Sequence, residues 1–323
     1  MIKRLNISVV LIFMALLFPA CSDSDLMRLA KQGDARAQYN LALMYANGEG
    51  VPQDYKAAVK WYTLAAEQGL AQAQYNLAWM YDHGEGVPED DKAAVKWYAL
   101  AAEQGSAKAQ LNLGSMYANG EGVPEDDKAA VKWYALAAEQ GLAQAQYNLG
   151  VMYANGEGVP QDYKAAVKWL TFAAEQGFAN AQFNLGVMSA NGEGVPEDDK
   201  AAVKWYTLAA EQGYAGAQYN LGVMYFNGEG VPQDYKAAVK WLTFAAEKGT
   251  AKAQYNLGVM YRSGAGVILD NVYAHMWFNI AGSNGVESAA AARDIVENRL
   301  TKADLSKAQD LARNCVHKEY KGC

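Results

Sequence analysis

Seven of the eight tryptophans are evenly spaced along this chain of 323 residues, each 36 residues from the next: Trp61, Trp97, Trp133, Trp169, Trp205, Trp241 and Trp277. A fixed period of roughly 20 to 50 residues is typical of a solenoid, in which a unit too small to bury its own apolar face packs that face against the next copy. The spacing therefore predicts seven structural repeats, although the length alone suggests about two globular domains.

The fourth copy, residues 141–176, predicts a first helix followed by a loop. Its apolar positions lie at helical spacing on one face: Ala145, Leu149, Met152 and Tyr153. Gly156 ends this helix, because glycine adopts the left-handed conformation of a helix C-cap at little cost. Gly158 and Pro160 then form the connecting loop.

A second helix follows the loop. Asp162 is placed to cap it by accepting hydrogen bonds from exposed backbone N–H groups, and Gly177 ends it. Its apolar face consists of Ala165, Ala166, Trp169 and Ala173. We expect the periodic tryptophans to be core residues that hold adjacent helices together, so that removing one costs about 3 to 5 kcal/mol.

Three motifs occur together and in the same order in several copies: A-x-A-Q-x-N-L-G-x-M-Y, G-E-G-V-P and A-x-x-W-Y-x-x-A-A-E-Q-G. From Gly33 to about Asn284 the chain resembles the Sel1-like repeat family of bacterial proteins, relatives of the tetratricopeptide repeats. The resemblance implies an all-α, right-handed superhelical solenoid of seven 36-residue helix-turn-helix repeats with helical caps. It also implies the binding of other proteins, and it brings no common catalytic activity.

The chain divides into four parts: a signal peptide (1–20), a linker with a capping half-repeat (21–32), the seven repeats (33–284) and a C-terminal helical cap with a tail (285–323). Residues 26–32 resemble the back half of a second helix. Near the other end, Thr301 and Asp304 predict a capping box before an amphipathic helix. Such caps cover the exposed ends of a solenoid.

The first residues predict export. Lys3 and Arg4 precede an apolar run, residues 7–18, that has the length of a secretory signal and is short for a membrane span. The stretch that ends in Cys21 resembles a bacterial lipobox, which implies a lipid anchor on Cys21 and a periplasm-facing outer-membrane lipoprotein. A periplasmic or secreted protein, or one with an uncleaved anchor, is the alternative.

The remaining cysteines, Cys315 and Cys323, lie close together at the C-terminal end. Export to an oxidising compartment favours a disulfide between them that holds the tail. Two free thiols are the alternative.

Differences between copies concentrate at positions four, eleven and fourteen, counted from the first glycine of each repeat, and these positions share one face of the first helix. First helices line the concave groove in tetratricopeptide-like solenoids. We therefore predict a groove that binds a protein or peptide partner through Arg36, Leu43, Trp79, Asp82, Lys108, Phe226 and Arg262.

Trp79 is the one tryptophan outside the period, and an aromatic side chain on a groove is typical of a residue that anchors a partner. The alternative is that Trp79 fills a gap against the next repeat. Phe226, with Arg262 one copy on, forms a second candidate patch, for which a tolerated surface aromatic is the alternative.

An asparagine recurs four residues after position four in every copy, and Asn76, Asn112 and Asn148 are candidates to hydrogen-bond a bound peptide. The alternative is a structural role, because an amide can also satisfy polar groups between repeats.

Lysines such as Lys164 and Lys168 form a basic stripe along the second helices. A repeated stripe of this kind favours solvation, and contact with an anionic envelope polymer is the more specific hypothesis.

The sequence offers no catalytic, metal or cofactor motif. Its three histidines, His83, His275 and His317, lie in different parts of the chain and lack a partner at motif spacing. The net charge of −7 argues against nucleic acid as a partner. We therefore predict a non-catalytic scaffold of the bacterial envelope that binds protein or peptide partners. The alternatives are a structural protein that binds peptidoglycan or another anionic glycan, and a wall-fragment hydrolase.

Overall fold

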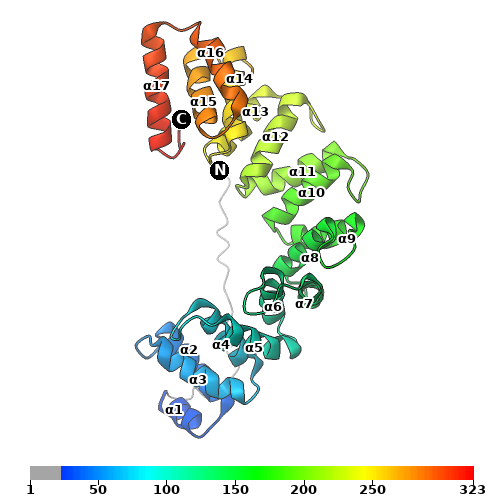
Figure 1. Ribbon diagram of the computed structural model, residues 1–323, viewed down its shortest axis with the longest axis vertical. Coiled ribbons are helices and arrows are strands. Elements are labelled where there is room, and N and C mark those ends of the chain that lie inside the picture. Colours follow the sequence, from blue (N-terminus) through cyan, green and yellow to red (C-terminus); the bar gives the residue numbers. More distant parts are fainter. Residues whose placement is uncertain (1–22) are drawn as a thin grey trace, which may run out of the picture. The chain divides into compact units, whose positions relative to one another are not determined.

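The computed structural model of the chain describes residues 23–323, and this part is an all-α solenoid of 17 helices without a strand (Figure 1). The predicted signal peptide and Cys21 lie outside the described residues. None of the described helices is both long and apolar enough to cross a membrane.

The helices run in chain order as follows: α1 (Asp23–Lys31), α2 (Ala35–Asn47), α3 (Tyr55–Glu67), α4 (Ala71–His83), α5 (Asp91–Glu103), α6 (Ala107–Asn119), α7 (Asp127–Glu139), α8 (Ala143–Asn155), α9 (Tyr163–Glu175), α10 (Ala179–Asn191), α11 (Asp199–Glu211), α12 (Ala215–Asn227), α13 (Tyr235–Ala246), α14 (Ala251–Ser263), α15 (Asn271–Ser283), α16 (Glu287–Glu297) and α17 (Lys302–His317). Even-numbered helices from α2 to α14 are the first helices of the repeats, and odd-numbered helices from α3 to α15 are the second.

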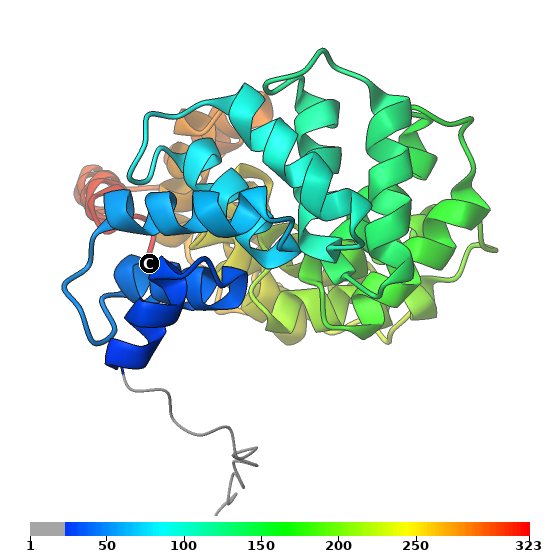
Figure 2. The ribbon, with the colours of Figure 1, turned by 90° about the horizontal axis from the view of Figure 1, so that it is seen from below.

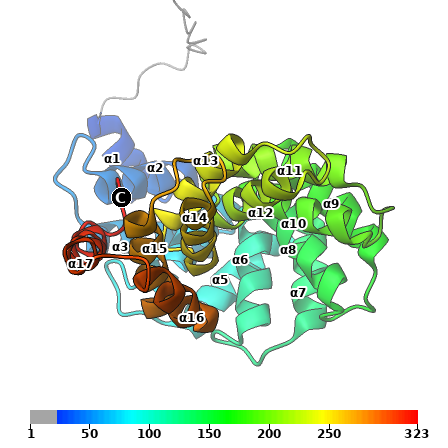
Figure 3. The same cartoon turned by 90° about the horizontal axis from the view of Figure 1, so that it is seen from above.

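The described chain forms two compact units. The N-terminal unit holds the residues up to 116 together with 120–124, and the C-terminal unit holds 117–119 and 125–323. Helix pairs of successive repeats stack side by side within each unit (Figures 1 and 2). In the C-terminal unit, α8, α10 and α12 lie on the inner side and α7, α9 and α11 on the outer side (Figure 3).

The helix boundaries of the fourth copy agree with the prediction. Gly156 is the C-cap of α8, with a φ of 77°, and its N–H donates to the Met152 carbonyl. The Asp162 carboxylate caps α9 by accepting from the backbone N–H groups of Lys164 at 2.9 Å and Ala165 at 3.0 Å. Local capping therefore accounts for both ends of the loop.

The periodic tryptophans are not the most buried residues of the second helices, so this part of the prediction is wrong. Trp277 is buried, but the other six are half-buried. The residue after each tryptophan is at most 5% exposed: Tyr62, Tyr98, Tyr134, Leu170, Tyr206, Leu242 and Phe278.

A small residue in the first helix makes room for this buried residue: alanine in the first two copies, Ala42 and Ala78, and glycine in the other five. A Cβ at Gly186 would lie 2.5 Å from the Tyr206 ring. Trp97 instead packs beside the cluster that includes Tyr62 and Leu77, in the preceding helices. The residue after each tryptophan therefore packs into the first helix of its own repeat, whereas a tryptophan such as Trp97 lies at the edge of the cluster before it.

A buried glutamine joins each repeat to the helix before it, a role that the sequence analysis did not assign. Its Nε2 donates to a backbone carbonyl near the end of the preceding helix at 3.1–3.2 Å, in the pairs Gln38–Ala30, Gln74–Ala66, Gln110–Ala102, Gln146–Ala138, Gln182–Ala174, Gln218–Ala210 and Gln254–Ala246. Carbonyls in a last helical turn lack a partner within the helix, so this bond satisfies a group that burial would leave unpaired.

The glutamine oxygen is satisfied by the end of the next second helix. Gln182 Oε1, for example, accepts from Gln212 Nε2 at 2.7 Å. In the next repeat Lys248 stands where the preceding one has Gln212. Its ammonium donates to the Gly213 carbonyl and not to the oxygen of the buried glutamine, Gln218. Gln218 Oε1 is consequently buried without a hydrogen-bond partner.

Both ends of the described chain carry a cap. Helix α1 supplies the Ala30 carbonyl to Gln38, as a second helix does elsewhere. Thr301 caps α17 by accepting from the Asp304 N–H at 3.1 Å. A disulfide joins Cys315 to Cys323, whose Cα atoms are 5.5 Å apart.

Candidate functional site

The N-terminal unit contains a hollow of about 350 Å³ between α2, α3 and α4, lined by both aromatic and polar side chains. We call it the aromatic hollow, and it is lined by Leu43, Ala46, Asn47, Tyr55, Tyr62, Tyr75, Asn76, Trp79, Met80 and Glu85. Leu43, Ala46 and Trp79 stand at the variable positions eleven and fourteen. The structure thus brings together residues that the sequence analysis placed on one face.

Trp79 is half-buried, and two kinds of contact hold its ring. The His83 ring stacks on it, with centroids 4.3 Å apart and planes at 21°, and the other contacts come from the cluster around Leu77. His83 Nδ1 also lies 3.1 Å from the Trp79 carbonyl oxygen. Trp79 therefore packs against its neighbours and also lines the hollow.

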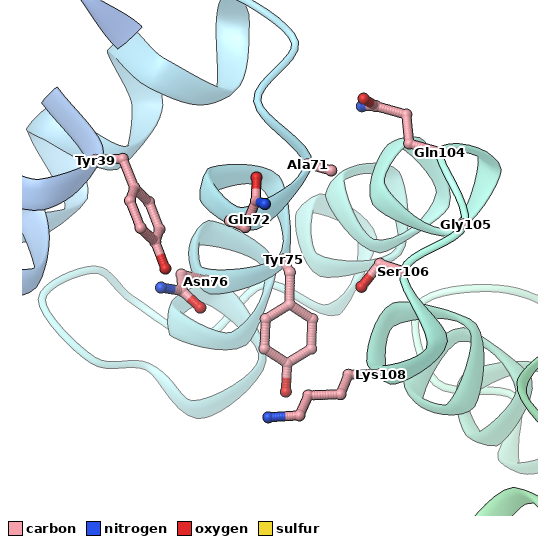
Figure 4. A pocket seen from close by; sticks show the side chains of 9 residues that line it. All are labelled: Tyr39, Ala71, Gln72, Tyr75, Asn76, Gln104, Gly105, Ser106 and Lys108. Atoms are coloured by element: carbon pink, nitrogen blue, oxygen red, sulfur yellow. The ribbon is translucent and has the colours of Figure 1, made fainter. Parts of the chain in front are cut away.

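A second hollow of about 400 Å³, whose lining side chains are drawn in Figure 4, shares Tyr75 and Asn76 with the first. We call it the polar hollow, and it is lined by Tyr39, Ala71, Gln72, Tyr75, Asn76, Gln104, Gly105, Ser106 and Lys108. Burial, followed by the negative charge of Asp82, raises the pKa of Tyr75. Its hydroxyl is therefore protonated at neutral pH and able to donate a hydrogen bond.

The C-terminal unit contains an apolar hollow of about 220 Å³, lined by Tyr219, Val223, Phe226, Asn227, Leu242, Asn256, Val259 and Met260. Val223, Phe226 and Val259 lie five periods after Leu43, Ala46 and Trp79, at the same positions of the repeat. The Phe226 ring lies 5.3 Å from the Tyr235 ring. We call this site the C-terminal hollow.

Three predicted groove residues lie outside the lining of these hollows. Arg36 is exposed on α2. Asp82 accepts a hydrogen bond from the buried Tyr98 hydroxyl at 3.2 Å. The Arg262 guanidinium lies 5.9 Å from the ring centroid of buried Phe278, so its structural contact is with Phe278.

The candidate asparagines make contacts within the protein. Asn76 Nδ2 donates to the Tyr62 hydroxyl at 3.1 Å, across the contact between two repeats. This hydroxyl is buried, and burial raises the pKa of Tyr62 to about 12. Asn112 interacts with the Tyr98 side chain, and Asn148 accepts from Gln144 at 2.9 Å. These contacts favour the structural alternative, although Asn76 also lines both hollows.

The lysine stripe is exposed on the second helices. In five repeats a lysine ammonium lies 5.0–5.2 Å from the ring centroid of the adjacent tryptophan: Lys96, Lys132, Lys168, Lys204 and Lys240. Cation–π attraction of this kind orders the side chain and leaves its charge available to solvent.

Titratable groups are scattered in the described part of the chain. Residues 23–323 contain no cluster of three His, Cys, Asp or Glu side chains that could hold a metal ion. Buried His275 has its Nε2 3.5 Å from Glu297 Oε2, and burial lowers the pKa of His275.

The helix pairs and the hollows between first helices define an all-α solenoid of the repeat class. The family model described as Sel1 repeat matches seven consecutive segments, residues 35–70, 71–106, 107–142, 143–178, 179–214, 215–250 and 251–286. The chain belongs to this family. Sel1 repeat proteins are generally non-catalytic scaffolds for protein interaction.

The chain is similar to solved structures of bacterial proteins. A Sel1 repeat protein from Oxalobacter formigenes is 39% identical, with a TM-score of 0.68 over 83% of this chain and 78% of its own. A protective antigen of uropathogenic Escherichia coli, c5321, which displays an SLR fold, is 32% identical over 92% of this chain and 87% of its own, with a TM-score of 0.37. An immunity protein of Pseudomonas aeruginosa, Pa5087, is 24% identical over 66% and 81%, with a TM-score of 0.37. No match was found among curated proteins.

Proposed function

We propose that the protein is a non-catalytic scaffold of the bacterial envelope that binds a protein or peptide partner in the groove of its first helices. The aromatic hollow carries this proposal, because Trp79 departs from the repeat and lines a cavity between the first and second repeats. A half-buried tryptophan in such a cavity is typical of a residue that dominates binding energy.

Capture from an envelope extract tests the proposal. The Trp79→Ala variant of the full chain is expected to lose most of the captured partner, while its helical content by circular dichroism stays unchanged. Phe172→Ala is the matched control, because Phe172 is a 41% exposed aromatic on a second helix. Equal capture by wild type and Trp79→Ala would remove Trp79 from the proposed site.

Export and lipid anchoring at Cys21 are part of this proposal, supported by the sequence before that residue. Cells that express the chain are labelled with a fatty-acid analogue and fractionated. We expect label and outer-membrane association in the wild type and their loss in Cys21→Ala. Label that persists in this variant would contradict the anchor.

A second candidate, the binding of peptidoglycan or another anionic glycan, is supported by the exposed lysine stripe. Charge-based binding weakens as salt rises, because ions screen exposed charges. Sedimentation of the chain with purified cell wall at low salt tests it. Failure to pellet would exclude this candidate.

A further inference from the structure

We propose that the N-terminal unit recognises a peptide segment in which an acidic side chain lies close to a large apolar one. The apolar side chain enters the aromatic hollow and the carboxylate enters the polar hollow. This inference rests on the proposed function, peptide binding in the groove, and specifies what the peptide carries.

The two hollows are parts of one trough, because Tyr75 and Asn76 line both. An extended peptide advances about 3.3 Å per residue. Side chains one to three residues apart therefore reach adjacent hollows without bending the peptide. The Asn76 amide is fixed by its bond to the Tyr62 hydroxyl, so the boundary between the hollows is ordered.

The polar hollow favours a negative charge. Lys108 is the one charged residue among the nine that line it (Figure 4). It is exposed and takes part in none of the ion pairs between described side chains. It also lies in the first turn of α6, where the helix dipole adds positive potential. The Tyr75 hydroxyl offers a further donor for a carboxylate, although the negative charge of Asp82 also acts on Tyr75.

The aromatic hollow disfavours the same charge. The one charged residue of its lining is the acid Glu85, where the polar hollow has Lys108. A carboxylate placed there would lose hydration and face a like charge. The opposite preferences of the two hollows thus fix which side chain of the peptide enters which one.

The combination of Trp79 with Lys108 occurs only in the N-terminal unit. Five periods after Trp79 and Lys108 stand Val259 and Ser288, so the C-terminal unit has neither the tryptophan nor the cation at these positions. The C-terminal unit therefore supplies an internal comparison for the preference for acid.

Selection of peptides tests the inference. The full chain, purified in detergent and immobilised, is exposed to a displayed library of random heptapeptides, and the enriched pool is sequenced. The same selection is made with Lys108→Gln, Trp79→Ala and Lys92→Gln. Lys92 is exposed on α5, so its variant removes the same charge elsewhere in the unit. Circular dichroism melting verifies that each variant is folded.

We expect the wild-type pool to carry Asp or Glu within three positions of a large apolar residue. Lys108→Gln is expected to lose the acid and keep the apolar residue, Trp79→Ala to lose the apolar preference, and Lys92→Gln to match the wild type. For one enriched peptide, Lys108→Gln should weaken the Kd about three- to tenfold, as for a partly exposed charge-assisted hydrogen bond. The peptide with Glu replaced by Gln should bind both proteins equally.

Enriched peptides without acid, or an acidic preference that persists in Lys108→Gln, would overturn the inference and leave peptide binding by the groove intact. A library that yields no enriched peptide would overturn both the inference and the proposed function. The two failures are therefore distinguishable.

Discussion

The aromatic hollow and the C-terminal hollow stand at the same position of the repeat, five periods apart, and differ in the side chains that fill them. Trp79 corresponds to Val259, and Ala46 corresponds to Phe226, so each hollow receives its large ring from a different helix. Both hollows rest on helix pairs with a buried glutamine, although Leu242 and Gly222 stand where the N-terminal unit has Tyr62 and Ala42. The packing residues thus form similar helix pairs beneath both hollows. The residues at the variable positions determine which side chain of a partner each hollow can accommodate.

The largest expected change in the free energy of unfolding distinguishes a packing residue beneath the C-terminal hollow, Leu242, from a residue that lines it at a variable position, Phe226. Leu242 is fully buried, and Leu242→Ala should cost about 2–5 kcal/mol, because it leaves a cavity at the contact between repeats. Phe226→Ala should cost about 1 kcal/mol or less, since this ring is half-buried and Ala46 is its natural counterpart. Urea unfolding of the full chain measures both. Similar losses of stability in the two variants would mean that Phe226 is a packing residue like Leu242.

A smaller effect tests how closely the helices approach beneath each hollow. A Cβ at Gly222 would lie 2.8 Å from Leu242 Cγ, so Gly222→Ala should destabilise by about 1–3 kcal/mol through overpacking. Its counterpart Ala42 is buried beside Tyr62, and Ala42→Gly should cost about 1 kcal/mol through helix propensity. An unfolding midpoint that rises in Gly222→Ala would show that the C-terminal support is looser than the structure indicates.

The junction at Lys248 offers a gain of stability. Lys248→Gln restores the amide that other copies place there and should add about 1 kcal/mol, because Gln218 Oε1 would regain a donor. Gln212→Lys at the preceding junction is the reciprocal control and should cost about 1–3 kcal/mol, since Gln182 Oε1 would lose its partner. Thermal melting of the three proteins checks the order. A neutral Lys248→Gln would show that solvent already satisfies Gln218.

The sequence predicted the fold well, because capping and periodicity act locally. Gly156 and Asp162 mark helix ends whatever the tertiary contacts are. The degree of burial was predicted less well. Helical spacing placed Trp169 on the apolar face of its helix, but it cannot distinguish a residue at the centre of a helix contact from one at its edge. That distinction depends on which neighbour approaches, and here Leu170 meets the glycine of the first helix.

The candidate site was predicted in part. Variation among copies indicated Leu43, Trp79 and Lys108, and these line the two hollows. Tyr75 and Asn76 join the hollows. Asn76 was a candidate because it recurs in every copy, whereas Tyr75 was not, since its position is a tyrosine in most copies and variation could not indicate it. Arg262 varies as well, yet it lies over Phe278, a contact that spans two helices and leaves no trace in the spacing.

The smallest expected effect is on the pH dependence of stability, and it comes from His275 in the C-terminal unit. His275 is buried beside Glu297, with Arg293 and Asp294 nearby, and burial lowers its pKa from the usual 6.5. The unfolded chain therefore binds this proton more readily, so the stability contributed by neutral His275 is present above about pH 6.5 and is lost as pH falls through the pKa of the folded state. Melting at pH 7.5 and 5.5 should show a decline in wild type that is smaller in His275→Gln. His83→Gln, which changes an exposed histidine in the N-terminal unit, is the control and should leave the decline as it is in wild type. A decline of the same size in His275→Gln would assign the pH dependence to other groups.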